Sequence, residues 1–345
     1  MLRFHPQLLA LFLWLAASAA AFAAERLPIP ALTPAPLPAS YDAIVEPPPR
    51  DARTNPLQTA IDAAPDNATK PYVILVKPGR YRWQPTLIPA TKRFIHLIGE
   101  DPNTTLISYH LNVYETLKAR RLEGYDGITL TVLADDFSAT NLTFENASGE
   151  HGQALALRLD GDRATIRNCR LLGWQDTLRS EKGRHYFRDC YIEGRVDFIY
   201  GGGTAVFENC EIRSKAGGYV TAASTPPESA FGYVFLRCRL TYDPMPWEPG
   251  LPSRPAFLGR PWRPHAAVAF IECELGDHIE PAGWHNWSKP ESEKTARYAE
   301  YSSTGPGANP GARVPWSKQL TAAEAAAYTV QNVLGGADAW MPAQP

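Results

Sequence analysis

Short runs of β-branched and aromatic residues alternate with turn residues along most of the chain. From about residue 72, segments such as YVILVKPGRY, FIHLIGE and GITLTV are separated by Gly, Asn and Asp. This pattern is typical of short strands joined by turns. The 32 prolines point the same way, because proline breaks the hydrogen-bond ladder inside a helix. The sequence therefore predicts an all-β protein rather than a helical bundle.

One sequence unit recurs through the middle of the chain, in the variants ATNLTFENA, RATIRNCRLLG, HYFRDCYIEG, TAVFENCEIRS, YVFLRCRLTY and VAFIECELGD. Successive units lie 22, 21, 20, 28 and 35 residues apart when one small residue of each is aligned. Because such a unit cannot bury its apolar face alone, successive units are expected to stack as parallel strands. We predict a right-handed, single-stranded parallel β-helix with short N- and C-terminal helices. The aligned small residues are Ala147, Cys169, Cys190, Cys210, Cys238 and Cys273.

All five cysteines fall in this aligned column, which predicts small side chains that face a tightly packed interior. Neighbouring coils bring such residues close together, so a Cys169–Cys190 or a Cys190–Cys210 disulfide is an open alternative. An odd number of cysteines leaves at least one thiol without an intramolecular partner. Neither the cysteine spacing nor the eight histidines resemble a metal site, and we expect no metal and no cofactor.

The N-terminal residues have the features of a secretory signal peptide. Residues 1–24 carry Arg3, then an apolar run, and end in the small-x-small pattern Ala21-Phe22-Ala23. The run is short for a membrane-spanning helix. We therefore expect a protein that is secreted or periplasmic, that does not contact a membrane after signal cleavage, and that is a monomer.

The remaining chain divides into a proline-rich strap at residues 25–50 and one catalytic β-helix domain at residues 51–345. Asn55-Pro56 opens a short apolar-periodic segment and predicts a helix that closes one end of the fold. Thr321-Ala322-Ala323-Glu324 is a capping-box pattern and predicts a second short helix near the C-terminus.

Composition and charge exclude two classes of protein. The 34 basic and 36 acidic residues give 34 − 36 = −2, which argues against a nucleic-acid partner. A hydrophobic content of 44% with 20% charged residues argues against a disordered chain.

Two glutamines and two aspartates occupy matching positions in neighbouring repeats. Gln153 and Gln175 each lie 6 residues after the aligned small residue, and Asp176 and Asp197 each lie 7 residues after it. Counted back from the next cysteine, Asp197 and Arg260 both lie at −13. The register therefore predicts one patch of five polar side chains. Adjacent residues point to opposite faces of an ideal strand, so this interpretation requires a bend between Gln175 and Asp176.

This patch suits catalysis better than a solvated polar ladder. Two carboxylates one coil apart raise each other's pKa unless a cation intervenes, and an arginine beside one of them keeps that one ionised. The pair then consists of one anion and one proton donor, which are the groups that nucleophilic and general acid catalysis need.

Four sequence blocks in the same region resemble the signature blocks of pectin methylesterases, and the resemblance extends from about Ala43 to Gly335. It implies a β-helix that needs no metal and that removes methyl esters from the C6 carboxyl of methyl-esterified polygalacturonan, releasing methanol. The blocks are Gly152-Gln153-Ala154-Leu155-Ala156-Leu157, Gly173-Trp174-Gln175-Asp176-Thr177-Leu178, Val196-Asp197-Phe198-Ile199-Tyr200-Gly201 and Leu258-Gly259-Arg260-Pro261-Trp262.

The resemblance also implies a role for each residue of the patch. Asp197 corresponds to the nucleophile, which forms an aspartyl acyl-enzyme, and Asp176 to the general acid and then base. Arg260 corresponds to the residue that orients Asp197 and keeps it ionised. Gln153 and Gln175 correspond to the donors that stabilise the oxyanion.

Three further residues are candidates for binding the polysaccharide. Tyr200 and Trp262 are aromatic residues beside the catalytic blocks, and ordinary packing is the alternative to stacking on sugar rings. Arg179 stands where the family often has tyrosine. We hypothesise that Arg179 attracts the free carboxylates of de-esterified substrate and favours runs of cleavage along one chain. Trp284 and Trp287 are interpreted as packing residues.

Three alternative functions are weighed against this interpretation. A β-helical polygalacturonate hydrolase or lyase is disfavoured, because its usual sequence blocks are missing and an inverting hydrolase needs well-separated carboxylates. An esterase for another ester, such as an acetyl ester or an acyl thioester, is disfavoured only by the family resemblance and by the aromatic residues expected in the groove. A non-catalytic polysaccharide-binding solenoid is disfavoured because all five catalytic positions are intact.

Overall fold

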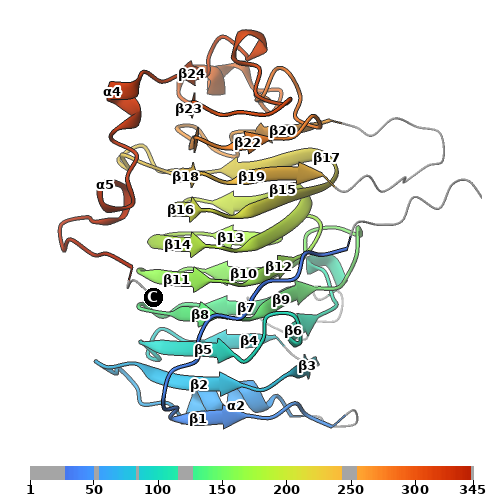
Figure 1. The fold of residues 1–345 in the computed structure, drawn as a ribbon, viewed down its shortest axis with the longest axis vertical. Helices are drawn as coiled ribbons and strands as arrows, with labels where there is room; N and C mark the ends of the chain where they lie inside the picture. The colour runs from blue at the N-terminus through green and yellow to red at the C-terminus, as the bar shows by residue number, and fades with distance from the viewer. Residues whose placement is uncertain (1–27, 50–53, 83–84, 116–126, 243–254, 343–345) are drawn as a thin grey trace, which may run out of the picture.

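The computed structural model describes residues 28–49, 54–82, 85–115, 127–242 and 255–342. The chain winds into a column of stacked coils, as predicted, with the strand at residues 43–45 at one end of the column and the strand at residues 318–319 at the other (Figure 1). The predicted signal peptide at residues 1–24 lies outside the described residues, as do residues 25–27 of the predicted strap and residues 51–53.

Parallel strands from successive coils form two sheets. The first sheet, here called sheet A, contains in spatial order β1 (Ala43–Val45), β2 (Tyr72–Val76), β5 (Ile95–Gly99), β8 (Ser138–Thr140), β11 (Ala164–Arg167), β14 (Arg184–Arg188), β16 (Thr204–Glu208), β18 (Tyr233–Leu236), β21 (Ala267–Ile271), β23 (Arg297–Tyr301) and β24 (Lys318–Gln319).

The second sheet, here called sheet B, is bent into two halves. The first half contains β3 (Gly79–Tyr81), β6 (Thr105–Tyr109), β9 (Thr143–Asn146), β12 (Arg170–Leu172), β19 (Arg239–Tyr242) and β22 (Glu274–Leu275). The second half contains β4 (Thr86–Ile88), β7 (Ile128–Val132), β10 (Leu155–Leu159), β13 (Leu178–Ser180) and β20 (Ala256–Gly259). The long strands β15 (Tyr191–Gly201) and β17 (Glu211–Ala223) pass through both halves. Each coil therefore has three faces, and the bend in sheet B forms a corner that runs along the column.

The turn between sheet A and sheet B explains why Asn or Asp precedes the aligned cysteine in several repeats. Asn168, Asp189 and Asn209 have φ of 48°, 54° and 54°, in the left-handed region that asparagine and aspartate tolerate best among residues with a side chain. Arg237 and Glu272 adopt the same conformation in the later coils. The turn then directs the following cysteine into the interior.

The cysteine column is confirmed from Cys169 onward. All five cysteines are buried and free, so neither alternative disulfide forms in this structure. The alignment of Ala147 with this column is wrong. Thr143 pairs with Arg170, which places Leu142, not Ala147, opposite Cys169. The preceding Asn141 has the expected φ of 57°.

The interior is filled by side chains that stack along the axis. Phe187, Phe207, Phe235 and Phe270 form one continuous ladder, with successive ring centroids 4.7, 4.5 and 4.4 Å apart. All four rings are fully buried, so the ladder joins four coils through contacts that exclude water.

Residues 28–42 of the predicted strap lie along the outside of the column (Figure 1), whereas Ala43–Val45 form β1 and join sheet A. Two asparagine side chains hold this segment, each with two hydrogen bonds of 2.8 to 3.1 Å. Asn103 donates to the Leu32 carbonyl and accepts from the Leu32 N–H, and Asn141 does the same with Ala35. Asn168 donates to the Thr33 carbonyl at 2.7 Å. The asparagines of the turn column thus also bind the proline-rich segment.

Short helices lie at both ends of the described chain. Helix α2 (Pro56–Ala63) begins at the predicted cap Asn55 and buries Leu57 and Ile61 against the first coils. Near the C-terminus, α4 (Ala322–Ala325) has the predicted capping box, and α5 (Val330–Leu334) packs against sheet A. The 3-10 helices are η1 (Pro290–Lys294) and η2 (Pro310–Ala312).

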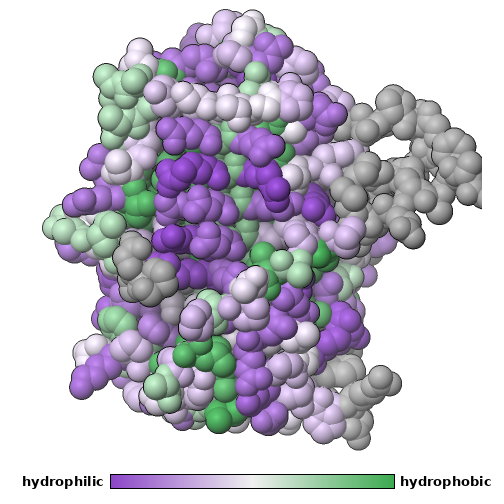
Figure 2. Space-filling model, in the orientation of Figure 1, coloured by the Kyte–Doolittle hydropathy of each residue, from purple (hydrophilic) through white to green (hydrophobic). Residues whose placement is uncertain are grey.

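Figure 2 shows hydrophilic residues stacked coil upon coil over the middle of the face seen in Figure 1. The apolar side chains are thus largely directed inward on this face. No helix within the described ranges is long and apolar enough to span a bilayer.

Candidate active site

The predicted polar patch lies at the corner of sheet B. Gln153 forms a parallel bridge with Gln175, and Gln175 forms one with Val196, so three successive coils meet there. Asp176 and Asp197 each follow a bridged residue and have φ of 65° and 51°. This left-handed conformation supplies the bend that the sequence interpretation required. The glutamines and aspartates can therefore face the same side of the sheet, although Gln175 and Asp176 are neighbours in the chain and would face opposite sides of a regular strand.

Asp197 is paired with Arg260, as the register predicts. Arg260 Nε donates to Asp197 Oδ1 at 2.8 Å, and Arg260 Nη2 donates to Oδ2 at 2.7 Å. This two-point contact fixes the carboxylate plane as well as its charge. Arg260 follows β20, two coils beyond the coil of Asp197, so its side chain reaches back over β17.

The two carboxyl groups have different pKa values. Burial and the charge of Asp197 raise the pKa of Asp176 to about 8. Burial also raises the pKa of Asp197, but the hydrogen bonds and the charge of Arg260 oppose that rise. The two carboxyl groups are therefore unequal: burial and the charge of Asp197 favour the protonated form of Asp176, and the two-point contact with Arg260 favours the ionised form of Asp197.

The amide groups of Gln153 and Gln175 are available to a ligand. Both side chains are partly exposed, and neither amide has a hydrogen-bond partner among the residues that the structure describes. Their backbones are fixed, because Val113 N donates to Gln153 O at 2.9 Å and Ala154 N donates to Gln175 O at 3.1 Å. Two donors are thus held next to the carboxyl pair, with no acceptor bound to them in the part of the chain that the structure describes.

Tyr200 has surroundings that the sequence did not indicate. Its side chain is only 8% exposed, which leaves little of the ring for a sugar to cover. The ring contacts Trp262 edge to face, with centroids 5.6 Å apart, and the hydroxyl is hydrogen-bonded to Asp176. Trp262 is half-buried and keeps an accessible surface.

Arg179 lies on the same outer face, directly opposite Tyr200 in the neighbouring strand. Arg179 Nε donates to Glu181 Oε2 at 2.7 Å, so part of its charge is compensated within the protein. Its guanidinium lies 5.6 Å from the Tyr200 ring centroid and 5.9 Å from that of Trp262. The three predicted substrate-binding residues are therefore neighbours.

Two aromatic residues at the site were not predicted. Tyr219 and Trp287 both lie against the Arg260 guanidinium, with ring centroids 3.8 and 3.6 Å from its central carbon. Trp284, in contrast, is a core residue, as expected: it is buried and stacks on Tyr298. The sequence GWHNW alone gives no signal that separates the two tryptophans.

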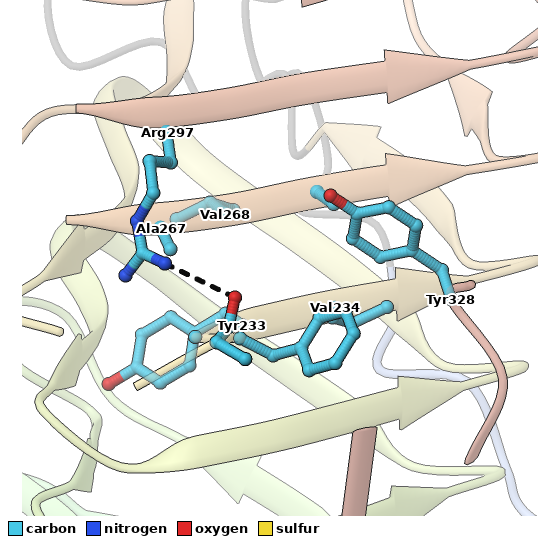
Figure 3. A pocket seen from close by; sticks show the side chains of 10 residues that line it. Tyr233, Val234, Ala267, Val268, Arg297 and Tyr328 are labelled. Carbon is cyan, nitrogen blue, oxygen red and sulfur yellow. Dashed lines mark hydrogen bonds between the residues drawn. The ribbon is translucent and has the colours of Figure 1, made fainter. Parts of the chain in front are cut away.

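A separate hollow of about 70 Å³ lies on sheet A, between β18 and β21. Figure 3 shows Tyr233, Val234, Ala267 and Val268 along it, with Arg297 reaching over the strands, where it donates to the Ala230 carbonyl at 3.2 Å. Its lining contains no carboxyl group or free amide, so it lacks the groups that the corner of sheet B provides. Within the described ranges, no three His, Cys, Asp or Glu side chains are grouped as metal ligands.

A β-helix that presents a protonated carboxyl, an arginine-bound carboxylate and two free amides on one corner has the fold and the chemical groups of a β-helical ester hydrolase. Comparisons with known proteins agree. A sequence model of the pectinesterase family matches residues 48–337. The chain therefore belongs to the pectinesterase family, whose members are carboxylic ester hydrolases.

Individual relatives support this assignment. The chain is 41% identical over 276 residues to Pectinesterase 31 of Arabidopsis thaliana, covering 78% of this chain and 84% of the relative. Pectin methylesterase from carrot superposes with a TM-score of 0.78 at 29% identity, covering 88% of this chain and 96% of the other. PemA from Erwinia chrysanthemi superposes with a TM-score of 0.71 at 31% identity, covering 89% and 100%.

Proposed function

We propose that this protein hydrolyses the methyl esters at C6 of methyl-esterified polygalacturonan, releasing methanol and leaving a free uronate. The observation that carries the proposal is the unequal carboxyl pair, in which Arg260 contacts Asp197 at two points and favours its ionised form, while the pKa of Asp176 is raised to about 8. Pectin methylesterases with similar structures support the substrate, including one solved in complex with a hexasaccharide, with a TM-score of 0.72 and 30% identity.

In the first half of the reaction, an oxygen of the Asp197 carboxylate attacks the ester carbonyl carbon, and the carbonyl oxygen becomes an oxyanion. The intermediate then collapses, the bond to the methoxy group breaks, and the proton of Asp176 passes to the departing oxygen to give methanol. The product is an anhydride between Asp197 and the uronate. Asp176 is now ionised.

In the second half, ionised Asp176 takes a proton from a water molecule that attacks the anhydride carbonyl of the uronate. Collapse of this intermediate returns the Asp197 carboxylate and releases the uronic acid. Asp176 has regained its proton, so the cycle closes with one ester and one water consumed.

The amides of Gln153 and Gln175 are proposed to donate to the oxyanion in both halves. They have no other partner among the described residues, so they need not break a hydrogen bond to do so. Replacement of either by alanine is expected to lower kcat by about 10²- to 10³-fold, the usual effect of losing one oxyanion donor.

Trp262 and Arg179 are proposed to contact the polysaccharide beside the reacting residue. Trp262 offers a half-buried ring, whereas Tyr200 is better suited to hold Asp176 than to stack on a sugar. Arg179 has one edge bound to Glu181, and the rest of its guanidinium is proposed to attract uronate carboxylates. An Arg179→Tyr variant is expected to show a weaker salt dependence of KM on partly de-esterified pectin.

Export is part of the proposal, since pectin is an extracellular polymer and residues 1–24 have the pattern of a signal peptide. We further propose that the mature protein acts as a monomer without a cofactor.

The decisive experiment compares wild type with Asp197→Asn on highly methylated pectin, following methanol and viscosity together. Asp189→Asn is the matched control, because Asp189 has a similar left-handed backbone conformation but lies outside the corner. Methanol release without early viscosity loss, abolished only in Asp197→Asn, supports the proposal. Viscosity loss without methanol would instead indicate a depolymerase, and methanol release by Asp197→Asn would rule out the proposed nucleophile.

A further inference from the structure

Arg260 reaches its partner over an intervening strand. Its backbone N donates to Thr221 O at 3.0 Å, so the residue begins beside β17, while Asp197 lies in β15 on the far side of that strand. In the pairing of β17 with β20, Thr221 lies opposite Gly259, which places Ala222 beside Arg260. Ala222 is buried and has a short side chain, so it leaves room for the arginine to cross.

A long side chain that crosses a strand has many rotamers, and only a few of them bring both nitrogens to Asp197. The two rings restrict this freedom. The Tyr219 and Trp287 centroids lie 3.8 and 3.6 Å from the central carbon of the guanidinium, which lies over both rings. Cations over aromatic faces at such distances are attracted electrostatically, and Arg260 is only 17% exposed.

The rings are themselves fixed by their neighbours. Tyr219 stacks on Phe257, with centroids 5.5 Å apart and planes 15° apart. His285 packs against both Tyr219 and Phe257, and its Nδ1 accepts a hydrogen bond from Trp287 N at 3.0 Å. His285 N in turn donates to Gly259 O at 3.0 Å, so this segment is tied to the strand that precedes Arg260.

We propose that Tyr219 and Trp287 are positioning residues that hold the Arg260 guanidinium in two-point contact with Asp197, and that His285 keeps Trp287 in place. The catalytic consequence of this inference rests on the proposed function. The contacts of Arg260 with Asp197, Tyr219 and Trp287 do not depend on it. The ring faces turned toward Arg260 are occupied by it, which distinguishes this role from stacking on a sugar.

The test uses Trp287→Ala and Tyr219→Ala, with Trp287→Phe and Tyr219→Phe as conservative variants that retain a ring. The alanine variants are expected to lower kcat about tenfold or more with little change in KM. They should also move the acid limb of the kcat/KM profile to higher pH, because a loosely held Arg260 no longer opposes the effect of burial on the pKa of Asp197. The phenylalanine variants should recover most of both effects.

Combining Trp287→Ala with Arg260→Lys tests whether the ring acts through the arginine. The two losses should then be far from additive, because the second substitution removes an interaction that is already lost. A rise in KM at unchanged kcat, or additive losses in the double variant, would overturn the proposal and make Trp287 a substrate contact.

A readout without substrate separates this inference from the proposed function. Carbon-13 NMR titration of the Asp197 carboxyl should show a higher pKa in Trp287→Ala than in wild type, whether or not pectin is the substrate. If Trp287→Ala does not fold, His285→Ala provides the same titration with a smaller change, and Trp287→Phe serves as the control that should stay close to wild type. An unchanged Asp197 pKa in folded Trp287→Ala or His285→Ala would contradict the positioning role of Trp287. Absence of methanol release by wild type would contradict only the proposed function.

Discussion

Asp176 and Asp197 occupy the same corner of successive coils and share a left-handed backbone conformation, with φ of 65° and 51°. A residue with a side chain adopts this conformation at a cost, and aspartate is among the residues that tolerate it best. At this bend the side chains no longer alternate between the two faces of the sheet, so each carboxyl group turns toward the other. The backbone at the corner therefore brings the two carboxyl groups together.

The activity is expected to fall on the alkaline side as Asp176 loses its proton. In the proposed mechanism, attack on the ester requires Asp197 ionised and Asp176 protonated, and the pKa of Asp176 is raised to about 8. The kcat/KM profile for methanol release should therefore show a basic limb near pH 8 and an acid limb set by Asp197. A rate that keeps rising well above that pH would show that Asp176 does not act as the acid.

Replacing Tyr200 by phenylalanine is expected to move this basic limb to higher pH. The hydrogen bond from Tyr200 lowers the pKa of Asp176 by stabilising its ionised form, and the variant removes only that hydroxyl. A charge-assisted hydrogen bond of about 1.5 kcal/mol corresponds to a shift of about one pH unit. Tyr191→Phe is the matched control, since its hydroxyl donates to Glu193 instead. Equal profiles for the two variants would contradict the assignment.

The site is also expected to cost stability at alkaline pH. Folding raises the pKa of Asp176 from 3.8 to about 8, so the folded state binds this proton more tightly, and its contribution to stability is lost as pH rises through that window. Asp176→Asn removes the effect. Its free energy of unfolding relative to wild type should increase with pH, by at most about 1.4 kcal/mol per unit.

Denaturant titrations near pH 5 and near pH 9 measure this difference directly. Asp189→Asn, at an exposed position on another turn, should show no such trend. A relative stability of Asp176→Asn that stays constant across this range would mean that the carboxyl is not perturbed in the folded protein.

The five cysteines are expected to be unreactive in the folded protein. All are buried and free, and burial raises the pKa of the Cys169, Cys190, Cys210 and Cys238 thiols, which suppresses the reactive thiolate. A thiol reagent should label almost nothing under native conditions and five groups after unfolding without a reductant. Three labelled groups after unfolding would instead reveal a disulfide.

The sequence predicted the fold well because the coil repeats the same structural requirements. A left-handed turn favours Asn or Asp, and the next residue must be small and apolar, so Asn168-Cys169 and Asn209-Cys210 reveal the period directly. The register failed at Ala147. Between Asn146 and Gln153 the chain adds a loop, and loop length is not constrained by the stacking of the strands.

Details of the site were predicted less completely. The pairing of Asp197 with Arg260 follows from the register, and the structure confirms the contact. The surroundings of Arg260 do not follow, because Trp287 lies in an irregular segment whose path no period determines. The hydroxyl contact of Tyr200 depends on the bend at Asp176, which strand alternation does not predict.

The stacked architecture has a consequence for how such a protein can change in evolution. Each coil advances the column by about 4.8 Å, so the separation between groups on different coils changes only in whole steps of that size. Gain or loss of one coil between Asp197 and Arg260 would preserve strand pairing everywhere and yet displace the guanidinium from its carboxylate. The number of coils before Gln153 does not affect the distances between these groups. Changes in coil number that leave the site intact are therefore expected in that part of the chain.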